Sequence, residues 1–271
     1  MTEALVPSIM SSTPTNLFLV EVAAGYLVNA VGGMFFYLVF AGLSFWYLYV
    51  FKREQYFPPT LPIDLKLQVR QEISYACWSI PIMAVLLTPF QLLIVNGYGK
   101  VYENVDEYGW GYFLFSIPFF LLFTDMLIYF IHRALHWNIF YKYIHKPHHR
   151  FRYTTPFSSH SFHPLDGWAQ GIPYYIFALL FPIHNKLFMV LFVLVNFWTI
   201  SIHDQVDFQG AGIINSTGHH TIHHELFVYN YGQYTTLWDR LCGTYKPSFK
   251  TNELLTGKRI IKKRGSKAKA A

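Results

Sequence analysis

The stretch that decides the fold is residues 113–136, FLFSIPFFLLFTDMLIYFIHRALH. It belongs to an apolar run, Tyr108–Ile131, whose only charged residue is Asp125. The run exceeds the roughly 20 residues that a transmembrane helix needs. It is followed at once by His132 and His136, which are four residues apart and so lie on one face of a helix. The stretch therefore predicts a membrane-spanning helix that leaves the bilayer with two imidazoles.

The composition of the whole chain also indicates a membrane protein. Hydrophobic residues make up 53% of it, aromatic residues 20% and charged residues 13%, about half the charge content of a soluble domain. So few charges cannot cover a surface in water, and we expect hydrocarbon to be the main solvent. Its two cysteines, Cys77 and Cys242, cannot form a disulfide or metal framework.

Three apolar runs predict three spans: Val22–Phe51, Ser74–Gly97 and Tyr108–Ile131. Two shorter runs, Gly167–Asn185 and Leu187–Ile202, predict a helical hairpin that enters the bilayer and returns. The predicted fold class is all-α: an integral membrane protein of about three spans plus a helical hairpin, with a cytosolic histidine-rich cap. We expect one domain over residues 1–271, with its core at about 113–245 and a basic cytosolic tail at 246–271.

The loop charges predict the orientation. Lys52–Glu72 is rich in Lys and Arg, whereas Asn96–Trp110 has one lysine against three acids. Because basic loops stay in the cytosol, His132–Gly167 and the chain from His203 onward are expected on the cytosolic side. The net charge of +6 owes much to Lys258–Arg264. We interpret that cluster as a contact with anionic membrane lipid, because no nucleic-acid motif accompanies it.

The histidines carry the strongest functional signal. All 13 lie between His132 and His224. Solvated or capping roles are usual for one histidine, but not for repeated boxes. The spacing puts two or three imidazoles on each helix face, and several converging faces can enclose two metal ions. The boxes are His132-x3-His136, His145-x2-His148-His149 and His220-x2-His223-His224, joined by the pair His160-x2-His163 and by His203 and His219.

The type of ligand does not name the metal, since imidazole suits Fe, Zn, Cu and Ni. The absence of His-Glu-x-x-His and Cys-x-x-Cys from the sequence disfavours a metalloprotease and a structural zinc site. The absence of Glu-x-x-His disfavours a carboxylate-rich di-iron bundle. A nitrogen-rich site beside apolar walls suits the oxidation of a lipid by a redox metal and O₂.

Two roles stay open for Asp125, which lies two helical turns before His132. An acid inside a span is costly and usually functional, so it either orients a ligand imidazole or makes a helix-packing hydrogen bond. We read His184, outside every box, as structural.

The order of the three boxes resembles the fatty acid hydroxylase/sterol desaturase superfamily, over roughly Phe113–Tyr245. Within that range Thr155–Gly167, Trp198–Asp204 and Tyr229–Arg240 are similar to stretches of sterol C5-desaturases. The resemblance implies nine metal ligands: His132, His136, His145, His148, His149, His203, His220, His223 and His224. It leaves six residues as ligands or as groups that orient a ligand: His160, His163, His219, Asp125, Asp166 and Asp204. Asp166 and Asp204 each adjoin a box histidine and are expected to hold its second ring nitrogen.

The resemblance also implies a reaction. A Δ7-sterol is the expected substrate, two iron ions and O₂ the expected cofactors, and a C5–C6 double bond the product, with both oxygen atoms leaving as water. Electrons are expected from NAD(P)H through a reductase and cytochrome b5, which would dock from the cytosol on Lys146, Arg150 and Arg152. A solvated loop is the alternative reading of those three charges. The ending Lys267-Ala-Lys269-Ala-Ala271 resembles a signal that returns membrane proteins to the endoplasmic reticulum.

Two other functions remain open from the sequence. A hydroxylase of the same superfamily, acting on a C4-methyl sterol or a fatty acyl chain, shares the first hydrogen abstraction and differs in how the substrate is positioned. A metal transporter would need polar residues along its spans, where Asp125 is the only acid.

Overall fold

The computed structural model describes residues 14–207 and 212–248. Its long helices are α1 (Pro14–Phe45), α3 (Leu65–Leu93), α4 (Gly109–Leu135), α7 (Pro164–Leu180) and α8 (Asn185–Ser201). Its short helices are η1 (Trp46–Phe51), α2 (Arg53–Tyr56), η2 (Ile94–Tyr98), η3 (Val105–Glu107), α5 (Asn138–Phe140), η4 (Tyr141–His145), α6 (Lys146–His149), η5 (Pro156–His160), α9 (Thr217–Leu226) and α10 (Leu237–Leu241). Two short strands, β1 (Val101–Tyr102) and β2 (Ile183–His184), pair in parallel. The predicted basic tail lies almost entirely outside the described residues.

Within the described part of the chain, three helical segments are long and apolar enough to cross a membrane: Leu17–Phe51, Leu65–Tyr98 and Gly109–Leu135. This confirms the predicted membrane fold with three spans. The second helix begins nine residues before the predicted span, because the side chain of Asp64 caps it by accepting a hydrogen bond from the backbone N–H of Leu67 (3.0 Å).

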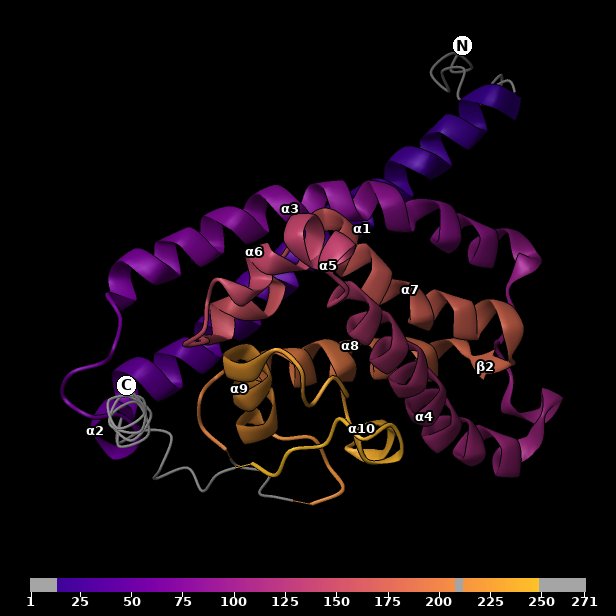
Figure 1. The fold of residues 1–271 in the computed structure, drawn as a ribbon. Coiled ribbons are helices and arrows are strands. Elements are labelled where there is room, and N and C mark those ends of the chain that lie inside the picture. The colour runs from indigo at the N-terminus through magenta and orange to yellow at the C-terminus, as the bar shows by residue number, and fades with distance from the viewer. Residues whose placement is uncertain (1–13, 208–211, 249–271) are drawn as a thin grey trace, which may run out of the picture.

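The hairpin of α7 and α8 packs among the long helices (Figure 1). The ring of Phe177 on α7 meets Phe119 and Phe120 of α4 at centroid distances of 5.2 and 5.1 Å. The turn of the hairpin holds β2, and the backbone N–H of Ile183 donates to the carbonyl of Lys100 (3.1 Å). The strand pair was not predicted from the sequence, because runs of two residues have no recognisable alternation.

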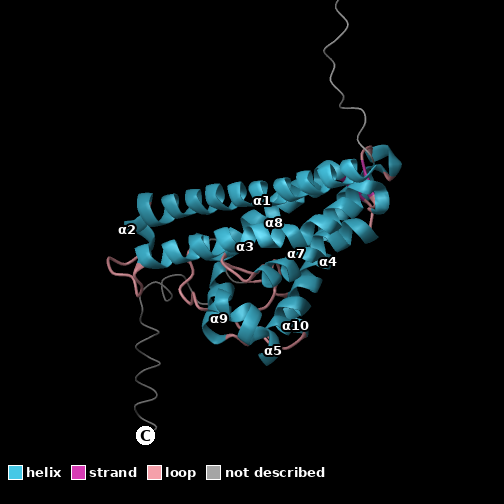
Figure 2. Ribbon diagram, turned by 90° about the horizontal axis from the view of Figure 1, so that it is seen from above, coloured by secondary structure: helices cyan, strands magenta, loops and turns pink. Residues whose placement is uncertain are grey.

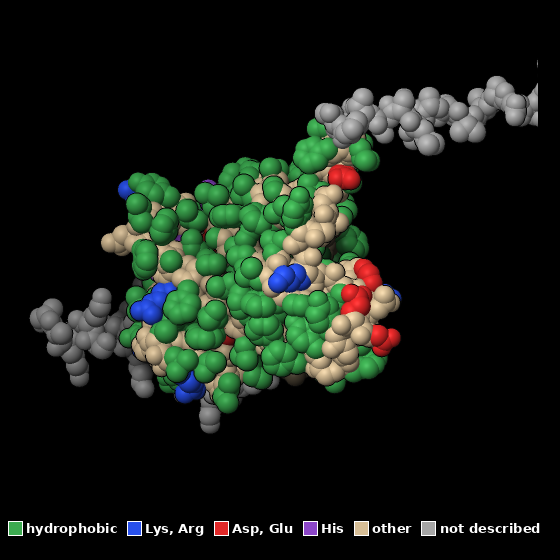
Figure 3. All heavy atoms as spheres, turned by 90° about the vertical axis from the view of Figure 1, so that its right-hand side faces the viewer, with side chains coloured by type: hydrophobic (Ala, Val, Ile, Leu, Met, Phe, Trp, Pro, Cys, Tyr) green, Lys and Arg blue, Asp and Glu red, His purple; other side chains and the backbone are tan. Residues whose placement is uncertain are grey.

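Six of the short helices, α5, η4, α6, η5, α9 and α10, form a cap at one end of the long helices (Figure 2 shows α5, α9 and α10). This cap, residues 132–163 and 203–248 as far as they are described, is tied to α3: Glu72 accepts a hydrogen bond from Thr155 Oγ1 (2.5 Å), and Gln68 Nε2 donates to the carbonyl of Tyr153 (2.6 Å). Tyr49 of η1 packs with Val206 of the cap. The loop 52–64 therefore lies at the cap end. The opposite end carries β1 and η3, and the surface seen from there is mostly hydrophobic with a few acidic side chains at one edge (Figure 3).

Candidate metal centre

The nine histidines assigned as ligands from the sequence fall into two groups in the described structure. Within each group the candidate ligand atoms all lie within 4.8 Å of one another. The five-histidine group is His132, His136, His145, His149 and His223; the four-histidine group is His148, His203, His220 and His224. Eight of the nine are buried and His136 is half-buried.

Helix geometry divides the boxes between the two groups. In the second box His145 and His149 belong to the five-histidine group, while His148 belongs to the other. In the third box, on α9, His223 belongs to the five-histidine group, and the flanking His220 and His224 belong to the other. Because residues i and i+4 share a face and residue i+3 lies beside them, one short helix can contribute to two adjacent sites.

The positions of the ring protons show which nitrogen each histidine presents. A backbone carbonyl can only accept, so a histidine Nδ1 in contact with one must carry the proton, and its Nε2 is then an unprotonated lone pair. Such partners orient metal-ligating imidazoles. The pairs are His132 with Tyr231 (3.0 Å), His223 with Tyr229 (2.8 Å), His203 with Thr199 (2.7 Å) and, at a longer distance, His148 with Ser161 (3.4 Å).

The carboxylate of Asp166 holds a further ligand candidate, His145. Its Oδ2 lies 2.7 Å from Nδ1 of His145, and both side chains are fully buried. Its Oδ1 accepts a hydrogen bond from Gln170 Nε2 (2.6 Å). The sequence predicts that Asp166 orients the neighbouring His163. The carboxylate instead contacts the ring of His145, which lies 21 residues away in the sequence.

The close contacts between ring nitrogens fit a bound cation. Nε2 of His132 and Nε2 of His145 are 3.1 Å apart, and the Nδ1 of each ring faces an oxygen acceptor. Two facing lone pairs repel unless a cation lies between them. An imidazole nitrogen binds a divalent transition metal at about 2.0–2.1 Å, so two ligands at right angles are about 3 Å apart. His203 and His220 make the same kind of approach, with 2.9 Å between their Nε2 atoms.

The acid–base properties of the cap histidines agree with metal ligation. Burial, followed by neighbouring imidazoles, lowers the pKa of His148 to about 3. The same two causes lower the pKa values of His220, His223 and His224 well below their usual range. These rings are therefore neutral at physiological pH, which is the state that binds a metal.

The three further histidine candidates lie outside both groups. His163 accepts a hydrogen bond at Nδ1 from the backbone N–H of Leu165 (3.2 Å) and so begins α7. His219 lies 2.9 Å from Ser216 Oγ at the start of α9. His160 faces a cavity beside the histidine groups.

Asp125 does not hold an imidazole. Its Oδ1 accepts hydrogen bonds from the backbone N–H groups of Gln233 (3.0 Å) and Tyr234 (2.8 Å), and its Oδ2 accepts from Thr235 Oγ1 (2.5 Å). It therefore fixes the loop whose Tyr231 carbonyl orients His132, which makes its effect on the centre indirect.

Asp204 likewise does not hold the neighbouring His203, whose Nδ1 proton goes to the Thr199 carbonyl instead. The carboxyl Oδ1 of Asp204 accepts from the backbone N–H of Val206 (2.9 Å). The reason is helical geometry: the carbonyl at i−4 lies directly below the ring of His203 at the end of α8.

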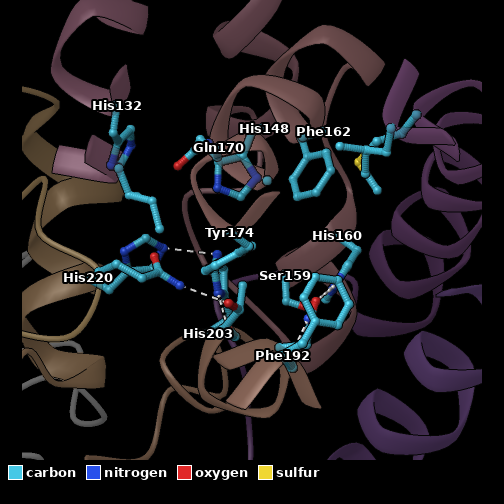
Figure 4. A pocket seen from close by; sticks show the side chains of 18 of the residues that line it. His132, His148, Ser159, His160, Phe162, Gln170, Tyr174, Phe192, His203 and His220 are labelled. Carbon is cyan, nitrogen blue, oxygen red and sulfur yellow. Dashed lines mark hydrogen bonds between the residues drawn. The ribbon is translucent and has the colours of Figure 1, made fainter. Parts of the chain in front are cut away.

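A cavity of about 110 Å³ lies against both groups, with His132, His148, His203 and His220 in its wall (Figure 4). The rest of its wall is largely apolar, and most of it comes from α3, α7 and α8. Tyr174, Tyr175 and Phe192 of the hairpin line it, whereas Trp168, Phe177, Phe181 and Trp198 belong to the packed core. Its apolar and aromatic lining includes Met83, Leu87, Ile128, Phe162, Tyr174, Tyr175 and Phe192.

Two kinds of residue that contribute to the site were not identified from the sequence. The carbonyls of Thr199, Tyr229 and Tyr231 act through the backbone, which leaves no side-chain signal. Asn196 lines the cavity and did have a signal, since it is an amide within an apolar run, seven residues before His203 on the same helix face.

The fold and the two histidine groups define a multi-span membrane protein with a nitrogen-rich site able to bind two metal ions. The family model described as fatty acid hydroxylase matches residues 117–244. The chain is 45% identical over 234 residues to the Δ7-sterol 5(6)-desaturase of Candida dubliniensis, covering 86% of this chain and 59% of the relative. It is 46% identical over 238 residues to the Δ7-sterol 5(6)-desaturase of Leptosphaeria maculans, covering 88% and 65%. It is 44% identical over 229 residues to the human lathosterol oxidase, covering 81% and 74%.

The chain therefore belongs to the fatty acid hydroxylase family. It spans less than two thirds of the length of the two fungal relatives. No solved structure matches it.

Proposed function

We propose that this protein is an O₂-dependent enzyme that introduces a C5–C6 double bond into a Δ7-sterol. The observation that carries the proposal is the apolar cavity with histidines of both groups in its wall, because an unactivated lipid carbon needs a redox metal within reach. The names of the relatives, Δ7-sterol 5(6)-desaturase and lathosterol oxidase, support the choice of substrate.

The nine histidines hold two iron ions in this proposal, one in each group. Iron supplies the one-electron chemistry with O₂ that abstraction of hydrogen from a saturated carbon requires. Burial lowers the pKa values of His203 and His223 and so keeps their rings neutral, and the carbonyls behind His132, His203 and His223 direct Nε2 inward. The apolar lining of the cavity excludes water and holds the flat substrate against the histidines.

Electrons from NAD(P)H would reach the centre through a reductase and cytochrome b5. Lys146, Arg150 and Arg152 are exposed on the cap, on the segment that also carries His148 and His149. They provide a positive surface beside the centre for an acidic electron donor, although its long-range attraction is screened within about 8 Å at physiological salt.

We place the protein in the endoplasmic reticulum membrane with the cap in the cytosol. The segment Lys52–Glu72, which is rich in Lys and Arg, begins at the cap end of the long helices, and basic loops stay in the cytosol. The lysine-rich ending that suggests retrieval to this membrane lies outside the described residues.

The test is conversion of a Δ7-sterol by microsomes containing the protein, with O₂ and NADH, followed by mass spectrometry. Wild type is expected to yield the 5,7-diene, His148→Ala none, and His184→Ala, outside both groups, close to the wild-type amount. Absence of the diene with active cytochrome b5 and reductase would sink the assignment. A hydroxylated 4-methylsterol or acyl product would then identify the family hydroxylase.

A further inference from the structure

A small polar cluster faces the cavity away from the metal centre. It consists of Ser159 and His160 on η5 and Asn196 on α8, all in the cavity wall. His160 is 8% exposed. Figure 4 shows Ser159 and His160 on the other side of the cavity from His132 and His220. No group of the metal centre is hydrogen-bonded to this cluster in the described structure, so it needs another role.

The protons of the cluster can be assigned from its contacts. Ser159 has one hydroxyl proton, which it donates to the carbonyl of Pro156 (2.6 Å). The Ser159 Oγ therefore serves as acceptor toward Nδ1 of His160, 3.0 Å away, and this Nδ1 carries the proton. Burial lowers the pKa of His160 to about 4. The ring is thus neutral at physiological pH, and its Nε2 is an acceptor.

A hydrogen bond also fixes the orientation of the Asn196 side-chain amide. Its Nδ2 donates to the carbonyl of Phe192 (2.7 Å), so the atom facing His160 is Oδ1. Nε2 of His160 and Oδ1 of Asn196 are 3.4 Å apart, and neither has a proton to give. In this tautomer the Nε2 of the buried His160 and the Oδ1 of the half-buried Asn196 are two acceptors that face each other beside the cavity, and such a pair requires a donor.

We propose that His160 Nε2 and Asn196 Oδ1 accept a hydrogen bond from the 3-hydroxyl group of the sterol. This inference rests on the proposed function for the identity of the ligand. The location is consistent with this: Asn196 on α8 lies seven residues before His203, one of the ligand candidates, which corresponds to about 10 Å along the helix axis. In a sterol, C3 and C5 belong to the same ring, so a hydroxyl held here keeps C5 and C6 toward the metals.

The first experiment measures binding, which does not depend on turnover. Purified protein in detergent is titrated with a Δ7-sterol, its 3-methyl ether and its 3-deoxy analogue, of which only the sterol can donate. Wild type is expected to bind the sterol about tenfold or more tightly than either analogue, since a buried acceptor is left unpaired by both.

The variants separate recognition from structure. His160→Leu and Asn196→Leu are expected to lose the preference for the hydroxyl, whereas His160→Gln, which restores an acceptor oxygen, keeps most of it. A purely structural role would weaken all three ligands equally and leave their ratio unchanged. Equal binding of the sterol and its ether by wild type would overturn the proposal and assign the acceptors to a water molecule. A hydroxyl preference without any diene in the conversion assay would retain this inference and reject the proposed reaction.

Discussion

The position of a single ring proton governs what each histidine can do. Wherever Nδ1 donates to a carbonyl, as His132 does to Tyr231, Nε2 is left for a metal. His145 differs because its partner, Asp166, is a carboxylate with both oxygens in use. A negatively charged acceptor strengthens the hydrogen bond and raises the basicity of the ligand.

Asp166→Asn is therefore expected to weaken metal binding about 10–100-fold. The amide offers one acceptor oxygen where the carboxylate offers two, so either His145 or Gln170 loses its partner. The measurement is iron content of the purified protein against increasing chelator. Asp64→Asn, an exposed helix cap, is the matched control and should behave as wild type. Equal iron retention by the two variants would contradict an orienting role for Asp166.

Among the helices, α7 carries Asp166 and one wall of the cavity. Two of its glycines, Gly167 and Gly171, are one turn apart and both line the cavity. A methyl group at Gly167 would overlap the ring of Phe162 and the sulfur of Met83, whereas one at Gly171 would lie 3.9 Å from Leu87, an ordinary contact. The close approach of α7 to Phe162 and Met83 thus requires glycine at position 167 but not at position 171.

Gly167→Ala is expected to lower the free energy of unfolding by about 1–3 kcal/mol, because Phe162 and Met83 must move. Gly171→Ala should raise it by about 0.5–1 kcal/mol, because alanine is the better helix former. Thermal unfolding of both variants in the same detergent provides the comparison. If Gly167→Ala proved as stable as Gly171→Ala, the close packing at Gly167 would be refuted.

For the molecule as a whole, side chains of the long helices hold the cap in place. Asp125 on α4 holds residues 233–235, and Tyr37 on α1 donates its hydroxyl proton to the carbonyl of Phe157 (2.9 Å). The cap and the loop 52–64 lie at one end of the long helices, and the loop that contains η3 lies at the other (Figure 1).

Cysteine labelling in sealed microsomes tests whether the cap lies on the cytosolic or the lumenal side of the membrane. In a background of Cys77→Ser and Cys242→Ser, Lys142→Cys on the cap is expected to react with a membrane-impermeant maleimide. Asp106→Cys should react only after the membrane is permeabilised. Both positions are exposed, so burial does not confuse the readout. The reverse pattern would place the metal centre in the lumen.

The sequence by itself determined the three spans, the hairpin and the three histidine boxes, because hydrophobic run length and the spacing of i, i+3 and i+4 are local properties. Only the tertiary structure decided how those histidines divide into two groups and what holds them. His132 depends on a carbonyl 99 residues away, and His145 on a carboxylate 21 residues away. It also showed that Asp125 and Asp204, both close in sequence to a ligand histidine, bind backbone N–H groups instead. Such partners are chosen by the packing of α4, α7, α8 and the cap, which no local pattern records.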